Sequence, residues 1–250
     1  MVSAQGLFAE CCGWLSFHEN RTYALAPTIT PISRQALFAG RPPTAFAETI
    51  ETTTRDAARW QAYWVNHNIP EGRVAHVAVK VNGQGLDELL AIAESKNRRL
   101  GVLVNLFDDV MHTVKDMPAE ADKRVYYDTL RSHLENGRLV ELFDLLLKHD
   151  YRLFVTADHG NIAGVGSGLK PPKALIESYA HRAAIFDKES LADDYAQAHN
   201  LRRLPLKTLP PVVQPVYLPG NQLFDSKGAT KISHGGLSLE ELVVPFAEVR

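Results

Sequence analysis

The sequence predicts an α/β fold with a mainly parallel central sheet and helices on both faces. Apolar runs of strand length alternate with segments of helical spacing along residues 73–186. These runs are apolar on both faces, as expected for strands that are covered by helices on both sides. The chain has 250 residues, 45% of them hydrophobic, which is enough to bury a substantial core in one large domain.

The first predicted elements are two strands separated by a helix. Residues 73–81 and 99–107 are rich in β-branched residues and leucine, which favour strands. Residues 86–96 between them have helical spacing. The same spacing returns over 119–149, where we expect Gly137 to divide the stretch into two helices.

The later elements are shorter. Residues 151–155 and 182–186 are apolar runs that predict buried strands. Residues 201–223 contain several prolines and predict a loop or a small excursion from the domain. A helical turn at 238–242 and a strand at 243–249 are expected to complete the fold.

Charge, hydropathy and cysteine content exclude several classes of protein. A formal net charge of −2 gives no general attraction for nucleic acid. No apolar stretch approaches the roughly 20 residues of a membrane span, so we expect no membrane partner. The two cysteines, Cys11 and Cys12, are adjacent, which suits neither a disulfide framework nor a zinc knuckle and favours a reducing cytoplasm.

An aspartate and a histidine follow the strand that ends at residue 155. Asp158 and His159 are metal ligands of complementary type, and Gly160 permits a turn that directs both side chains to one point. In parallel sheets, ligands bind beyond the carboxyl ends of strands. The alternative is that Asp158 and Gly160 only form the turn and His159 is a surface residue.

Two further histidines extend this set of candidate ligands. Asp108 and His112 follow the strand that ends near residue 107, and a helical turn would put them on one face. The alternative is a helix N-cap followed by a solvated histidine. His234 precedes two glycines on an irregular segment, and with Asp108 and His112 it would complete a two-histidine, one-carboxylate site.

A threonine near the N-terminus is the candidate nucleophile. Thr30 precedes Pro31, and proline favours the first helical position, so Thr30 is expected to be the N-cap. A hydroxyl there faces free backbone N–H groups, which favour an anionic phosphoryl group. Thr28 is the weaker candidate. Arg34, one turn further on, would steady phosphate oxygens or form a structural ion pair.

The ordered motifs together resemble the PglZ domain of the alkaline phosphatase superfamily. They are Pro27-Thr-x-Thr30 with Arg34 and Gly40, Asp108-x-x-x-His112, Asp158-His159-Gly160, and the closing stretch His234-Gly-Gly-Leu-Ser-Leu-Glu-Glu-Leu-Val-Val-Pro245. The resemblance implies an alkaline phosphatase-like fold and two divalent metal ions, usually zinc. In this pattern Asp108, His112 and His234 match the ligands of one ion, and Asp158, His159 and the nucleophile Thr30 match those of the other.

The chain departs from the family pattern at its N-terminus. Members open with an apolar strand that ends in an Asp, which is the remaining ligand of the second ion, but no Asp precedes Asp56 here. Only Glu10, His18 and Glu19 are plausible substitutes. The sequence therefore predicts a fold that lacks its first strand, an incomplete second metal site and a truncated chain. We divide it into an N-terminal remnant, 1–23, and a PglZ-type domain, 24–250.

Two functions follow from the resemblance. The first is a metal-dependent phosphoesterase of a bacterial phage-defence system of the BREX type. Its substrate would be a phosphate ester, with a phosphodiester preferred over a monoester and a nucleotide or nucleic-acid end as possible sources. The second, favoured by the missing Asp, is a catalytically impaired module that binds other phage-defence proteins.

Overall fold

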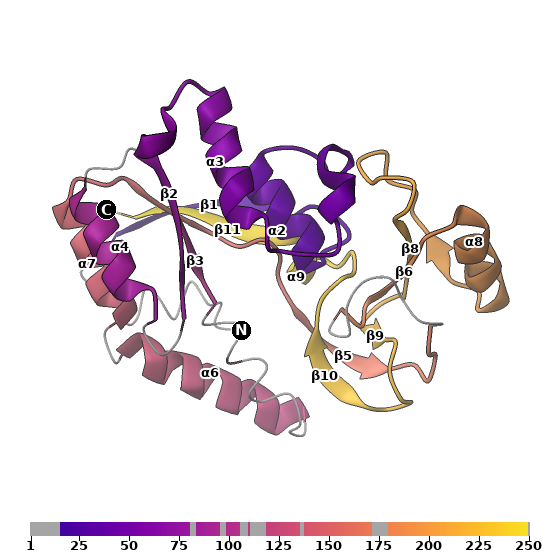
Figure 1. Cartoon of the computed structure of the whole chain (residues 1–250). Coiled ribbons are helices and arrows are strands. Elements are labelled where there is room, and N and C mark those ends of the chain that lie inside the picture. The colour runs from indigo at the N-terminus through magenta and orange to yellow at the C-terminus, as the bar shows by residue number, and fades with distance from the viewer. Residues whose placement is uncertain are drawn as a thin grey trace. The chain divides into compact units, whose positions relative to one another are not determined.

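The computed structural model describes residues 16–80, 84–95, 99–105, 110, 119–135, 138–171 and 180–249. The chain divides into two compact units (Figure 1). The first unit is formed by the described residues within 16–22, 57–156 and 245–249. The second is formed by 23–56 and 157–244. Both contain helices and strands, which confirms the α/β class.

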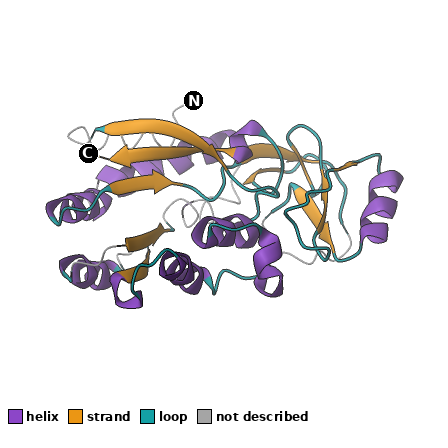
Figure 2. Ribbon diagram, turned by 90° about the horizontal axis from the view of Figure 1, so that it is seen from above, coloured by secondary structure: helices purple, strands orange, loops and turns teal. Residues whose placement is uncertain are grey.

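The first unit contains a three-stranded sheet and a parallel strand pair. The sheet has the order β1 (Phe17–Tyr23), β11 (Val243–Val249), β4 (Leu153–Thr156), and its strands lie side by side in Figure 2. Strands β11 and β4 are antiparallel. Strands β2 (Val74–Val79) and β3 (Arg99–Val104) pair in parallel along their whole length. The strands predicted at 73–81 and 99–107 are therefore confirmed, with shorter bounds, and they lie side by side in parallel.

The described helices of the first unit are α3 (Asp56–Asn66), η2 (Glu71–Arg73), α4 (Leu86–Glu94), α6 (Ala119–Glu135) and α7 (Arg138–Lys148). The apolar spacing predicted α4, α6 and α7, whereas α3 and η2 were not predicted. The boundary between α6 and α7 confirms the division expected near Gly137. Buried apolar residues of β2, α4, α6, α7 and β4 form one core, among them Val77, Leu89, Leu130, Leu142, Leu146 and Leu153.

The second unit carries two small sheets and four helices or helical turns among its described residues. The sheets have the orders β10 (Thr230–Ser233), β5 (Ile162–Gly166), β9 (Gln222–Leu223) and β6 (Ala183–Phe186), β8 (Gln214–Tyr217), β7 (Arg202–Arg203). The helices are α2 (Thr30–Ala39), η1 (Pro43–Thr49), α8 (Glu189–Ala198) and α9 (Leu239–Leu242). Two apolar clusters, one around Ile32 and Phe46 and one around Ala192 and Val216, form its core.

A mainly parallel central sheet is not confirmed. Strands β2–β3 and β5–β9 pair in parallel, whereas β4–β11, β5–β10, β6–β8 and β7–β8 are antiparallel. The predicted strands β4 and β6 exist, but each pairs with a strand that returns from a later part of the chain. An apolar run shows that a strand is buried and does not show which neighbour it takes.

The N-terminal segment contributes a strand that was not expected. Residues 17–23 form β1, which lies beside β11 and precedes Thr30. This strand contains His18 and Glu19 but no aspartate. The predicted division at residues 23 and 24 remains a prediction. Within the described ranges, no helix combines the length and the apolar character that crossing a membrane requires.

Candidate active site

Thr30 begins helix α2 but is not its N-cap, so that prediction is wrong. Ile29 occupies the N-cap with extended backbone angles, φ −105° and ψ 128°, and its carbonyl oxygen accepts a hydrogen bond from the Ile32 N–H at 2.9 Å. Thr30 and Pro31 are the first two helical residues. The Thr30 hydroxyl is used in a tertiary contact with His159 instead of capping its own helix.

The Thr30 hydroxyl lies against the imidazole of His159. Thr30 Oγ1 and His159 Nε2 are 3.0 Å apart. The other ring nitrogen, Nδ1, is 3.1 Å from the carbonyl oxygen of Gly160. Because a carbonyl only accepts, Nδ1 carries the proton and Nε2 of the neutral ring carries a lone pair. His159 therefore accepts a hydrogen bond from Thr30 and is placed to polarise its O–H bond.

Thr28 is held in a structural role. Its side chain is fully buried, and its Oγ1 donates to the Gly236 carbonyl and accepts from the Gly235 N–H, both at 3.0 Å. Its carbonyl oxygen accepts from His234 Nδ1 at 2.8 Å. A hydroxyl that already uses both its donor and an acceptor position is poorly suited to attack a substrate, which favours Thr30 over Thr28.

His159 and His234 meet although 75 positions separate them in the sequence. Their rings stack with centroids 4.1 Å apart and an interplanar angle of 22°. Each donates Nδ1–H to a backbone carbonyl, of Gly160 and Thr28 respectively. Metal-binding histidines are usually oriented by such a bond, which leaves Nε2 as the ligand atom. The shared tautomer fits both residues for metal ligation.

Asp158 adds a carboxylate beside His159. Its Oδ1 accepts the His159 backbone N–H at 3.1 Å, and its Oδ2 lies 3.8 Å from His159 Nε2. The residue types and the tautomers therefore fit a divalent ion. Among the described residues, however, no three His, Cys, Asp or Glu side chains converge closely enough to hold an ion by themselves. Metal binding thus remains a prediction.

The other predicted ligand pair lies outside the description of the structure. Asp108 and His112 belong to residues 106–109 and 111–118, which are not among the described residues. Their proposed role with His234 stays a prediction from the sequence.

Arg34 is paired with an almost fully buried aspartate. Arg34 Nε and Asp56 Oδ2 are 2.8 Å apart, and the two side chains are 14% and 6% exposed. Burial raises the pKa of Asp56 above its usual value, the Arg34 cation opposes this shift, and the Asp158 carboxylate adds to it. The ion pair expected as an alternative role for Arg34 is therefore present.

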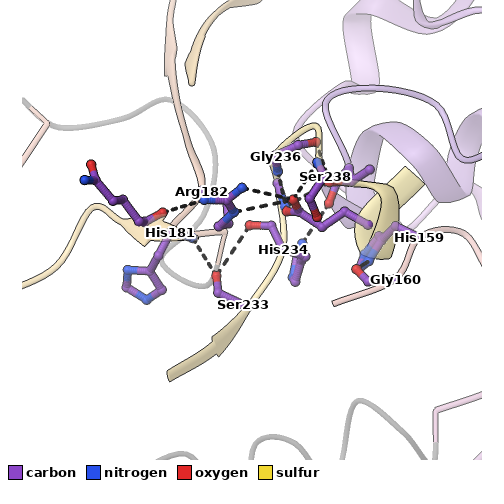
Figure 3. Close-up of polar contacts among 12 residues, drawn as sticks. His159, Gly160, His181, Arg182, Ser233, His234, Gly236 and Ser238 are labelled. Atoms are coloured by element: carbon purple, nitrogen blue, oxygen red, sulfur yellow. Dashed lines mark hydrogen bonds and ion pairs between the residues drawn. The ribbon is translucent and has the colours of Figure 1, made fainter. Parts of the chain in front are cut away.

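A buried ion pair that the sequence did not reveal supports both histidine segments (Figure 3). Arg182 and Glu241 are 2% and 0% exposed, and Arg182 Nη2 lies 3.3 Å from Glu241 Oε2. Figure 3 labels Arg182 and marks its polar contacts by dashed lines. Glu241 also accepts the Gly236 N–H at 2.6 Å and the Ser238 N–H at 3.1 Å, and its backbone carbonyl accepts the Gly160 N–H at 2.9 Å. One residue thus fixes the segment after His234 and the segment after His159.

The glycine at position 236 is required by this packing. A Cβ atom there would lie 2.7 Å from Glu241 Oε2, closer than a Cβ atom approaches another heavy atom in real structures. The preceding Gly235 has φ +109°, a conformation that other residues rarely adopt. Ser238 and Glu241 have the spacing of a capping box, in which Glu241 accepts a hydrogen bond from the Ser238 N–H. This spacing is the one sequence feature that could have predicted the position of Glu241.

Comparison with known families gives one match that covers almost the entire chain. Residues 13–249 match the family model described as the BREX system PglZ alkaline phosphatase-like domain. No curated protein matches the chain.

Proposed function

The chain belongs to the family of BREX system PglZ alkaline phosphatase-like domains, and we propose that it is a metal-dependent phosphoesterase with Thr30 as nucleophile. The observation that carries this proposal is the 3.0 Å contact between Thr30 Oγ1 and the Nε2 atom of His159. This contact lies at the N-terminus of α2, where the helix dipole favours a negatively charged group.

The proposed reaction is a displacement at phosphorus. Thr30 Oγ1 loses its proton to solvent water as it attacks the phosphorus atom, and the bond from phosphorus to the leaving ester oxygen breaks. The new phosphoryl ester on Thr30 is then hydrolysed by water. In the structure Nε2 of His159 accepts a hydrogen bond from the Thr30 hydroxyl. In the metal-loaded protein the same Nε2 lone pair would instead bind one ion, together with Asp158 and the Thr30 oxygen. When bound, such an ion lowers the pKa of the hydroxyl and neutralises charge on the phosphoryl oxygens.

The first ion of the family pattern would be held by Asp108, His112 and His234. The tautomer of His234, with Nδ1 donating to the Thr28 carbonyl, is compatible with that role. We infer zinc as the metal for both positions, because imidazole and carboxylate ligands suit it. The second position, at Thr30, has one carboxylate fewer than the family pattern, so we expect its ion to bind more weakly.

The preferred substrate is a phosphodiester, with a nucleotide or a nucleic-acid end as its source. The family description places such domains in BREX systems, so other phage-defence proteins are the proposed partners. The alternative function is a catalytically impaired module that only binds those proteins. Among the described residues no three candidate metal ligands converge, and this observation favours the alternative.

Metal content and metal-dependent hydrolysis test the proposal together. We expect the zinc-loaded protein to bind about two ions per chain and to hydrolyse bis(4-nitrophenyl) phosphate. A chelator should abolish hydrolysis, and added zinc should restore it. His159→Ala should lower both the zinc content and the rate, whereas the exposed His199→Ala should change neither. If hydrolysis persisted after chelation and in His159→Ala, the proposal would be refuted. The non-catalytic binding module would then be the remaining function.

A further inference from the structure

Within the described part of the chain, one carboxylate oxygen of Asp56 has no hydrogen-bond partner. The residue is 4% exposed, and its Oδ2 receives the Arg34 Nε–H at 2.8 Å. Among the described residues, nothing donates a hydrogen bond to Oδ1, although that atom is buried. An unsatisfied buried carboxylate oxygen is costly, so stability alone is a poor explanation for this arrangement.

The pair of Asp56 and Arg34 lies at the same end of α2 as Thr30. Arg34 follows Thr30 by four residues, and residues so spaced lie on one helix face. Asp158, the neighbour of His159, contributes to the raised pKa of Asp56. The helical spacing places Arg34, and with it the Asp56 that binds it, beside Thr30 at the candidate active site.

The Arg34 guanidinium is only partly used by the protein. Its Nε is held by Asp56, and within the described part of the chain neither terminal nitrogen, Nη1 or Nη2, has a partner. The side chain is 14% exposed, which leaves these two groups accessible. The guanidinium is planar. A hydrogen bond at Nε therefore fixes the direction in which the Nη1 and Nη2 groups point.

We propose that Asp56 is a positioning residue that holds Arg34 by Nε, so that both Nη groups bind the non-bridging oxygens of a phosphoryl group at Thr30. This inference rests on the proposed function. Two parallel N–H···O bonds from Nη1 and Nη2 match the spacing of two phosphate oxygens. The Asp56 charge also balances the arginine when the subsite is empty, which limits the cost of keeping a guanidinium largely buried.

Asp56 has a competing role, as a metal ligand in place of the aspartate that is missing before Thr30. The Oδ1 atom, which has no hydrogen-bond partner among the described residues, and the neighbouring Asp158 are also compatible with a metal-ligand role. The structure favours positioning, because the contact it shows is with Arg34. Among the described residues, moreover, Asp56 does not form a three-ligand cluster with Asp158 and His159. The two roles make different predictions for metal content.

Binding of inorganic phosphate to the zinc-loaded full chain, measured by calorimetry, distinguishes the two roles. Arg34→Lys keeps the positive charge but replaces the two Nη donors of the guanidinium by a single ammonium group. We therefore expect phosphate to bind about tenfold more weakly. Asp56→Asn should weaken binding in the same direction with zinc content unchanged. Because Asp56 acts through Arg34, adding Asp56→Asn to Arg34→Lys should cause no further loss. Arg55→Lys, an exposed arginine beside Asp56, is the matched control and should bind phosphate normally.

Three results would overturn the proposal. They are a loss of zinc in Asp56→Asn, additive losses in the double variant, and unchanged phosphate binding in Arg34→Lys. Circular dichroism checks that each variant folds. If Asp56→Asn does not fold, phosphate binding by Arg34→Lys alone tests the proposal. Phosphate binding needs no turnover, so the result is independent of whether the chain hydrolyses esters.

Discussion

Thr30→Val should abolish phosphoester hydrolysis and leave the fold intact. Valine has the shape of threonine without the hydroxyl, so the change removes the atom that lies 3.0 Å from His159 Nε2 and little else. Loss of a nucleophile typically lowers the rate by at least about a thousandfold. The measurement is kcat/KM with bis(4-nitrophenyl) phosphate. Thr30→Ser keeps a hydroxyl and should retain part of the activity.

Thr28→Val is the contrasting variant, because it makes the same chemical change two residues away. It removes the buried bonds of Oγ1 with Gly235 and Gly236, so we expect a loss of about 1–3 kcal/mol in the free energy of unfolding. The folded fraction should still hydrolyse the substrate. If Thr28→Val were folded and inactive while Thr30→Val kept its activity, the assignment of the nucleophile would be wrong.

Glu241→Gln should produce the largest loss of stability that we predict. The glutamine amide would leave the buried Arg182 guanidinium without a counter-charge, and it would place a donor where the Ser238 N–H now finds an acceptor. Breaking a buried ion pair in this way costs about 3–5 kcal/mol. Chemical denaturation gives this value, and hydrogen exchange should locate the loosening in residues 229–244.

Glu241→Gln should also weaken zinc binding at the candidate metal site. Glu241 fixes the backbone after both His234 and His159, through the Gly236 and Gly160 N–H groups. Partners that orient metal ligands typically contribute about 10–100-fold to metal affinity, so we expect a loss of zinc affinity in that range. Glu240→Gln, at the exposed neighbouring position, is the control. Equal effects of the two variants would show that Glu241 has no special role.

Local features of the fold were predictable from the sequence. The spacing of apolar residues located α4, α6, α7 and the parallel pair β2 and β3, because these elements bury a continuous apolar face. Strands β5 and β10 were not predicted. Their sequences, Ile162–Gly166 and Thr230–Ser233, contain glycine or polar residues, so no apolar run marks them. Their pairing depends on contacts between distant segments.

The candidate site was predictable where chemistry and spacing coincide. Asp158, His159, His234 and Thr30 stand out because residues with metal-binding or nucleophilic groups occur at turns and helix ends. Arg182 did not stand out, since it begins an apolar strand segment and its partner lies 59 residues away. Burial of a charged residue is a property of the tertiary structure. A sequence pattern shows that Glu241 caps a helix but not that it meets Arg182.

Acid-quench mass spectrometry during turnover tests the role of Thr30 most directly. The zinc-loaded chain is mixed with bis(4-nitrophenyl) phosphate, quenched in acid and digested. We predict a nitrophenyl phosphoryl group on Thr30, which should be absent from Thr30→Val and present in Thr28→Val. A phosphoryl group on another residue, or turnover with no labelled peptide while Thr30→Val remains active, would contradict the account.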